Sequence, residues 1–261
     1  MEMFKKLTMV IMTVLLAVGL SAVPEKQVEA AGKTEIIVSA AASLQDSLDK
    51  IAVLYEKQNP TIDLVFNYGA SGTLQKQIEQ GAPADLFFSA GDKQMKALVD
   101  GGLISDNKEL LKNQLVLVVP SNSKTSISTI TQLTDKAFKK VAVGQPESVP
   151  AGQYAQQSLT AKNVWTTLQS KLVFAKDVRQ VLSYVETGNA DAGFVYKTDA
   201  LTSKKVKIAL TVGAHVHSAI NYPVGIVKES KHQAEAKAFY NYVQTKTASD
   251  IFTSYGFKLA Q

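Results

Sequence analysis

Four short segments of this chain place small or hydroxyl-bearing residues where a strand pattern gives way to a helix pattern. The residues at these junctions are Ser43, Ser71, Ala151 and Val178. The first backbone N–H groups of a helix have no partner within the helix, and the helix dipole gives them a partial positive charge. Anions bind readily to such groups. Because no Lys, Arg or His stands at the four positions, the pattern predicts a site that holds an anion with neutral dipoles.

Each junction also has a purely structural interpretation. Ser43 and Asp46 have the spacing of an imperfect capping box, so Ser43 could simply cap a helix. The turn at 69–73 (GASGT) is similar to many tight loops and lacks both the phosphate-loop and the dinucleotide fingerprints. Pro150 suits the first position of a helix, and Asp177 suits the N-cap of another. The residues alone leave two interpretations open, an anion site or four well-capped helices.

Two further side chains stand near these junctions. Tyr196 closes a strand pattern at 192–196, where its phenol could donate a hydrogen bond into a cleft or could be an amphipathic residue of the rim. Arg179 is the sole Arg of the chain. We expect it to form a salt bridge behind the site or between domains, rather than to contact a ligand.

The segments between the junctions alternate short β-type runs with amphipathic helices, which predicts an α/β fold. The expected strands that precede the junctions are residues 35–39, 61–68, 141–144 and 172–174. Two expected helices have clear apolar faces, formed by Leu44, Leu48, Ile51, Ala52 and Tyr55 in one and by Val178, Val181, Leu182 and Val185 in the other. Ligands of open α/β sheets bind at the carboxyl ends of the strands, so the junctions are expected to meet there.

Residues 1–30 have the pattern of a secretory signal peptide. Lys5 and Lys6 precede an uncharged run at 7–23, and small residues follow near Ala30, the expected cleavage point. A membrane anchor is the alternative, but this run is short for a hydrocarbon core of about 30 Å. Val23 stands where a lipoprotein signal would carry its acylated Cys. We therefore expect a protein that works outside the cytoplasm, in the periplasm or at the cell surface.

The composition is that of a globular protein and excludes several classes of function. The chain has 261 residues, of which 46% are hydrophobic and 20% are charged, with a net charge of +5. It has no Cys, which excludes disulfides and a Cys nucleophile, and its three His leave little for a zinc enzyme. The densest lysine groups, at 136–140 and 204–207, are expected to be solvated surface rather than a nucleic-acid site.

Taken in order, a series of short motifs resembles the extracytoplasmic molybdate-binding protein of molybdate ABC transporters, across essentially the whole mature chain. The motifs lie at residues 40–44 (AAASL), 70–74 (ASGTL), 81–87 (GAPADLF), 142–144 (AVG), 149–152 (VPAG), 177–179 (DVR), 195–196 (VY), 199–200 (DA) and 255–257 (YGF). Each motif is common, but the complete series in this order is specific.

The resemblance implies a two-lobed type II solute-binding fold that closes on its ligand. Two mixed sheets with flanking helices would be joined by two crossing strands, at 114–120 and 222–227. After the signal peptide, residues 31–115 and 222–261 would form a discontinuous lobe I, and residues 116–221 would form lobe II.

The resemblance also implies the function and the site. The protein would capture molybdate, and tungstate as well, and deliver it to a membrane permease, as a monomer without a cofactor, a catalytic residue or a direct metal ligand. Ser43 and Ser71 would each give a hydroxyl and a backbone N–H, Ala151 and Val178 a backbone N–H, and Tyr196 its hydroxyl. Some relatives carry a serine where this chain has Gly72, which is expected to loosen that loop.

Two other functions compete with molybdate capture. A smaller tetrahedral oxyanion such as sulfate could be the ligand of the same site. A secreted hydrolase could use Ser43 or Ser71 as nucleophile, although neither lies in a G-x-S-x-G elbow. His215, His217 and His232 are the candidate bases, without an evident carboxylate partner. His215 and His217 would share a strand face and could bind a metal, but we expect them at the surface.

Overall fold

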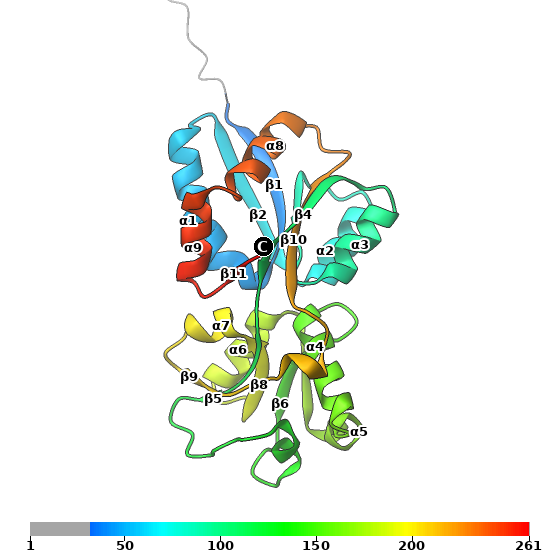
Figure 1. Cartoon of the computed structure of the whole chain (residues 1–261), viewed down its shortest axis with the longest axis vertical. Helices are drawn as coiled ribbons and strands as arrows, with labels where there is room; N and C mark the ends of the chain where they lie inside the picture. Colours follow the sequence, from blue (N-terminus) through cyan, green and yellow to red (C-terminus); the bar gives the residue numbers. More distant parts are fainter. Residues whose placement is uncertain (1–31, 261) are drawn as a thin grey trace, which may run out of the picture. The chain divides into compact units, whose positions relative to one another are not determined.

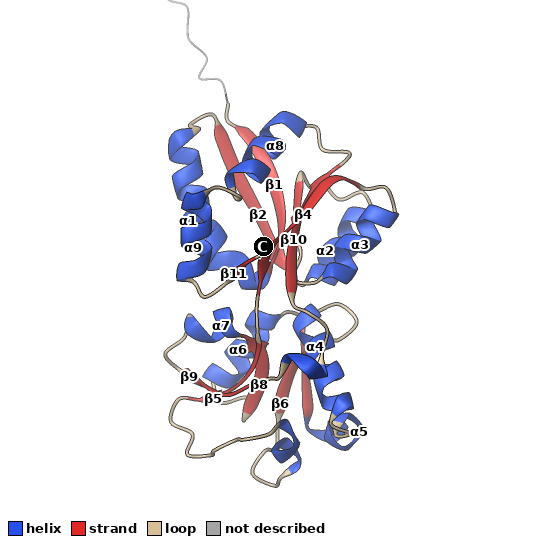
Figure 2. Ribbon diagram, in the orientation of Figure 1, coloured by secondary structure: helices blue, strands red, loops and turns tan. Residues whose placement is uncertain are grey.

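The polypeptide forms two separate mixed sheets with helices packed on them, which confirms the predicted α/β fold (Figures 1 and 2). The computed structural model describes residues 32–260, and the segment predicted as a signal peptide lies outside the described residues. We call each sheet with its helices a lobe. None of the described helices is long and apolar enough to cross a membrane.

The first lobe contains a six-stranded sheet in the order β11-β4-β10-β3-β1-β2. Its strands are β1 (Thr34–Ala41), β2 (Ile62–Gly69), β3 (Leu86–Phe88), β4 (Ile104–Lys112), β10 (Asn221–Val227) and β11 (Lys258–Leu259). Its helices are α1 (Gln45–Gln58), α2 (Ser71–Glu79), α3 (Asp92–Asp100), α8 (Gln233–Tyr242) and α9 (Lys246–Ser254). Figure 1 shows α1 and α9 on one side of the sheet, and α2 and α3 on the other.

The second lobe contains a five-stranded sheet in the order β7-β6-β8-β5-β9. Its strands are β5 (Leu115–Pro120), β6 (Val141–Gly144), β7 (Leu172–Ala175), β8 (Ala192–Tyr196) and β9 (Val206–Thr211). Its helices are α4 (Pro150–Ala161), α5 (Trp165–Leu168), α6 (Val178–Glu186) and α7 (Lys197–Leu201). Short 3-10 turns complete the chain: η1 (Ala42–Leu44), η2 (Ile130–Thr134), η3 (Gln169–Lys171) and η4 (Ala214–Val216).

Both sheets are mixed, because in each of them one antiparallel strand lies between strands of the sheet. In the first, β1 runs parallel to β2 and β3, and β10 enters antiparallel between β3 and β4. In the second, β6 runs parallel to β7 and β8, and β5 enters antiparallel between β8 and β9. Parallel neighbours are joined through helices, so the helix that follows each parallel strand begins at the carboxyl edge of its sheet.

The apolar faces predicted from the sequence are the faces that pack. Leu44, Leu48, Ile51, Ala52 and Tyr55 are all buried, and the α6 stripe of Val178, Val181, Leu182 and Val185 is at most 4% exposed. Burial of an aliphatic side chain of this size contributes about 1.5–3 kcal/mol to the free energy of unfolding. The same contacts hold α1 beside β2 and α6 beside β8.

The chain passes between the sheets twice, and the two passages are bonded to each other. Asn113 and Gln114 connect β4 to β5, and the segment that includes η4 connects β9 to β10. The backbone N–H of Asn113 donates to the carbonyl of Ile220 at 3.0 Å. The strands expected at the crossings are present as β5 and β10, and each pairs within a single sheet. The lobe boundaries given above stay a prediction.

Candidate ligand-binding site

Ser43 lies in η1, the 3-10 turn between β1 and α1, and only 4% of it is exposed. Its Oγ is 2.9 Å from the phenol oxygen of Tyr222. The N-cap of α1 is Leu44, without a side-chain capping bond, so the interpretation of Ser43 as a helix cap is wrong. The 3-10 turn adds residues between the strand and the α-helix, and this moves Ser43 off the capping position.

Ser71 is the first residue of α2 and is 1% exposed. Its Oγ accepts a hydrogen bond from the backbone N–H of Ala90 at 2.9 Å. The extended residue before it, Ala70, makes no side-chain cap. The hydroxyl of Ser71 therefore keeps its own hydrogen for another acceptor.

Ala151 and Val178 lie in the first turns of α4 and α6. Pro150 opens α4, as the sequence predicts. Asp177 caps α6 by accepting the N–H of Gln180 at 2.8 Å, which confirms the prediction for that residue. The N–H groups of Ala151 and Val178 have no helical carbonyl within reach, because they precede the first complete turn.

Tyr196 ends β8 and is 1% exposed, so its interpretation as a rim residue is wrong. Its phenol donates to the carbonyl of Ala90 at 3.3 Å. Burial raises the pKa of this phenol well above its usual value, which keeps the group a hydrogen-bond donor at neutral pH. Its ring packs edge-on against Tyr222, with centroids 5.6 Å apart.

These contacts link Ser43, Ser71 and Tyr196, and the helices that carry Ala151 and Val178 begin beside them. Ala90 joins Ser71 to Tyr196, and Tyr222 joins Ser43 to Tyr196. The start of α2 is bonded to the loop before α4, and α6 packs against η1. The carboxyl ends of strands from both sheets therefore meet at one buried place.

Gly72 makes a backbone contact between the lobes. Its N–H donates to the carbonyl of Ser148 at 2.9 Å, and a Cβ added to Gly72 would lie 2.7 Å from that oxygen. Glycine lets α2 approach the backbone of the opposite lobe. The expectation that it also loosens this loop stays a prediction.

Arg179 forms the salt bridge between domains that the sequence suggested. It pairs with Asp46 on α1 of the first lobe, and its Nε lies 3.0 Å from Asp199 on α7. Asp199 is fully buried and also accepts the N–H of Tyr196 at 3.2 Å. Burial raises the pKa of Asp199 to about 6, although the positive charge of Arg179 opposes the shift. Arg179 thus supports the backbone behind Val178 and Tyr196.

The histidines offer no catalytic partner to the serines. Ser43 and Ser71 bond to Tyr222 and Ala90, as described above. His215 lies in η4 rather than on a strand, so the shared strand face expected for His215 and His217 is wrong. The described residues contain no cluster of three His, Cys, Asp or Glu side chains that could hold a metal ion.

Three residues of the site were missed by sequence reasoning. Tyr222 was noted only as the start of a crossing strand, and Asn113 and Ala90 were not singled out. All three are far in sequence from the serine or tyrosine that they contact, at separations of 19 to 179 residues. The signal in the sequence that could have drawn attention to Tyr222 is a tyrosine at the first position of an expected crossing strand.

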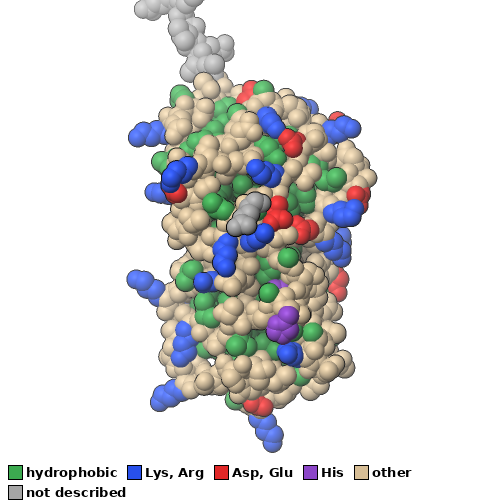
Figure 3. Space-filling view, in the orientation of Figure 1, with side chains coloured by type: hydrophobic (Ala, Val, Ile, Leu, Met, Phe, Trp, Pro, Cys, Tyr) green, Lys and Arg blue, Asp and Glu red, His purple; other side chains and the backbone are tan. Residues whose placement is uncertain are grey.

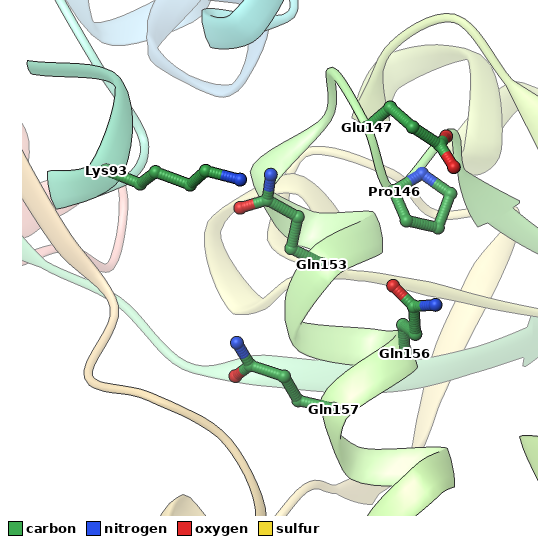
Figure 4. Close-up of a pocket in the computed structure, with 6 residues that line it drawn as sticks. All are labelled: Lys93, Pro146, Glu147, Gln153, Gln156 and Gln157. Carbon is green, nitrogen blue, oxygen red and sulfur yellow. The ribbon is translucent and has the colours of Figure 1, made fainter. Parts of the chain in front are cut away.

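A hollow of about 340 Å³ lies beside the start of α4 (Figure 4). Its lining residues are Lys93, Pro146, Glu147, Gln153, Gln156 and Gln157. Figure 4 shows Lys93 of α3 extending toward Gln153 of α4, so the two lobes face each other here. The face drawn in Figure 3 carries scattered Lys and Arg side chains, and the lysines of 136–140 and 204–207 are exposed, as expected for solvated surface.

Comparison with known proteins identifies the family. The model of a family described as bacterial extracellular solute-binding protein matches residues 36–258. The chain belongs to this family. A Bacillus subtilis relative, named as a putative ABC transporter substrate-binding lipoprotein, is 50% identical over 98% of this solute-binding protein and 99% of the relative. The molybdate-binding protein ModA of Escherichia coli is 41% identical over 88% and 91% of the two chains.

A solved structure supports the same family. The substrate-binding domain of a putative molybdenum ABC transporter from Clostridium difficile is 46% identical, covers 87% of this solute-binding protein and 99% of its own chain, and superposes with a TM-score of 0.66. The relatives are thus substrate-binding proteins of transport systems.

Proposed function

We propose that this solute-binding protein captures molybdate outside the cytoplasm and delivers it to the membrane permease of an ABC transporter. Relatives at 39% and 41% identity are named as molybdate-binding proteins, and they support this ligand. Tungstate has the same charge and nearly the same size, so it is proposed as a second ligand. The protein would act as a secreted monomer, without a cofactor and without converting the ligand.

The anion would be held by Ser43, Ser71, Ala151, Val178 and Tyr196. The observation that carries the proposal is that the buried hydroxyls of Ser43, Ser71 and Tyr196, from both lobes, are linked through shared partners beside the starts of α4 and α6. None of the five residues is charged. The nearest carboxylate in sequence, Asp177, is occupied by its capping bond. A buried dianion can be stabilised by such oriented dipoles without a countercharge.

The same arrangement suggests which anions are rejected. Phosphate carries at least one proton at neutral pH, and that proton needs an acceptor that the five residues do not supply. Sulfate is fully ionised but smaller than molybdate, so donors placed for the larger anion cannot all reach it. We therefore propose that charge state excludes phosphate and that size excludes sulfate.

Calorimetric titration of the mature protein with molybdate, tungstate, sulfate and phosphate tests the proposal. We expect one-to-one binding of the first two anions and little heat with the others. Sulfate binding as tight as molybdate binding would contradict the size argument. Turnover of a simple ester that is lost in Ser43→Ala would instead favour the hydrolase.

A further inference from the structure

We infer that Asn113 and Tyr222 are positioning residues that fix the direction of the Ser43 hydroxyl, so that Ser43 can only donate to the bound anion. The inference rests on the proposed function and names what enforces its selectivity for fully ionised oxyanions. A chain of three hydrogen-bonding groups, Asn113, Tyr222 and Ser43, runs from the passage between the sheets to the site.

The amide of Asn113 has one possible orientation. Its Oδ1 accepts the backbone N–H of Gln114 at 2.8 Å, and a backbone N–H can only donate. The Nδ2 group therefore faces the other way, toward Thr198 Oγ1 at 2.9 Å and the Tyr222 phenol at 3.3 Å. Asn113 thus acts as a donor to Tyr222.

Because Tyr222 accepts a hydrogen bond from Asn113, its phenol donates its own hydrogen to Ser43. The residue is 1% exposed, and burial raises the pKa of its phenol well above the usual value, so the group keeps its hydrogen. The phenol oxygen accepts from Asn113, and its hydrogen needs an acceptor because the side chain has no access to water. The distance to Ser43 Oγ, 2.9 Å, allows either oxygen to donate, and we assign the hydrogen to Tyr222 because Asn113 already donates to the phenol oxygen.

Ser43 then has one hydrogen left to give. Its oxygen already receives the Tyr222 hydrogen, so its own hydrogen is directed elsewhere, toward the place where the other predicted residues converge. Ser71 is set in the same way, because its oxygen accepts the N–H of Ala90. An ionised oxygen satisfies both hydroxyls. Together with the N–H groups of the proposed site, donors would face every oxygen of the anion, so a protonated oxygen would place its hydrogen against one of them.

The position of Asn113 links this chain of bonds to the passage between the sheets. Its backbone bonds to Ile220 in the other passage, and its side chain contacts Thr198 of the second lobe and Tyr222 of the first. The orientation of Ser43 therefore depends on contacts that involve both lobes.

Asn113→Asp is the sharpest test because it nearly preserves the shape of the side chain and reverses the direction of the hydrogen bonds from residue 113 through Tyr222 to Ser43. One carboxylate oxygen can still accept from Gln114, while the other accepts the Tyr222 hydrogen, so Tyr222 must accept from Ser43. The serine would then present lone pairs to the anion. We expect molybdate affinity to fall at least a hundredfold, and Tyr222→Phe alone to lower it about tenfold while narrowing the preference for molybdate over phosphate.

The double variant Asn113→Asp with Tyr222→Phe separates direction from charge. Phenylalanine has no hydroxyl, so it cannot accept the hydrogen of Ser43. The double variant should therefore bind molybdate at least tenfold more tightly than Asn113→Asp alone. A double variant that binds no better would show that the added charge causes the loss, and would overturn the inference. Tyr242→Phe is the control, since the Tyr242 hydroxyl has no hydrogen-bond partner in the described structure.

Each variant is first melted without ligand to show that it is folded. If Asn113→Asp does not fold, the test rests on Tyr222→Phe. A Tyr222→Phe protein that prefers molybdate over phosphate as strongly as the parent does would overturn the inference. Failure of the parent protein to bind molybdate would instead count against the proposed function, because the inference concerns only the difference between parent and variants.

Discussion

Gly72 of the first lobe donates its backbone N–H to the carbonyl of Ser148 in the second lobe at 2.9 Å. A backbone-to-backbone bond between lobes requires an approach that a side chain at position 72 would prevent. The nearest atoms to an added Cβ are the Ser148 carbonyl oxygen and Cα, at 2.7 and 2.8 Å. Neither atom belongs to a flexible side chain, so the two backbones would have to separate.

Gly72→Ala should therefore weaken anion binding. We expect molybdate affinity to fall about tenfold or more, with a small change in the melting temperature of the free protein, because the clash arises where the lobes meet. Calorimetry and thermal melting measure the two effects. The matched control is Gly69→Ala, whose Cβ would meet Leu74 at an ordinary 3.6 Å. Equal affinities of the two variants would refute this account of Gly72.

Replacement of Arg179 should destabilise the fold. Arg179→Gln leaves the fully buried Asp199 without its positive partner, and breaking a buried ion pair from one side costs about 3–5 kcal/mol. Urea denaturation should show a loss of that order, and adding Asp199→Asn should recover most of it. Asp46→Asn should cost far less, because the Asp46 side chain is 42% exposed. A double variant as unstable as Arg179→Gln would contradict this assignment.

Asp199 should also make stability depend on pH. Burial raises its pKa from 3.8 to about 6 in the folded protein. Between these values the folded state binds more protons than the unfolded state, so the free energy of unfolding decreases as pH rises. The contribution of this group is complete below about pH 4 and is lost above about pH 6. The free energy of unfolding of the parent, relative to that of Asp199→Asn, should therefore be lower at pH 7 than at pH 4.5. An equal difference at the two pH values would exclude a raised pKa of Asp199.

Ser43→Ala should lower molybdate affinity about ten- to a hundredfold. A hydrogen bond to a charged group is worth roughly 1.5–3 kcal/mol, and the variant removes one such bond from a buried site. Ser71→Ala should behave alike, whereas Ala151→Ser keeps its backbone N–H and should weaken binding only by crowding. Parent-like affinity in both serine-to-alanine variants would leave these residues with structural roles alone.

Tyr196→Phe tests whether its phenol serves the ligand or only Ala90. The phenol donates to the Ala90 carbonyl at 3.3 Å, a long bond that an anion could replace. We expect about a tenfold loss of molybdate affinity with little change in the melting temperature of the free protein. If Tyr196→Phe lowers the melting temperature but leaves molybdate affinity unchanged, the Tyr196 hydroxyl serves only its hydrogen bond to Ala90.

The sequence predicted best what depends on local pattern. The strands β6 and β8, the Asp177 cap and the buried stripe of α6 follow from periodicity and capping chemistry, which act over a few residues. The 3-10 turn at Ser43 was missed, because a strand-to-helix junction with a serine and an acidic residue has the same local signature as a capped helix.

The contacts between lobes could not be predicted in the same way. The Ser43–Tyr222 and Gly72–Ser148 pairs depend on how two sheets approach, and no local pattern encodes that approach. Arg179 was an exception, since a lone arginine beside a neutral anion site needs a carboxylate partner. Its partners Asp46 and Asp199 still came only from the structure.

A crystal structure of the mature protein grown with molybdate, with anomalous scattering recorded at the molybdenum edge, would show where the anion binds. We expect one strong molybdenum peak, with the oxygens of the anion about 2.7–3.2 Å from donors on Ser43, Ser71, Ala151, Val178 and Tyr196. A molybdenum peak in the hollow beside Lys93, or at any position out of reach of those five residues, would contradict it.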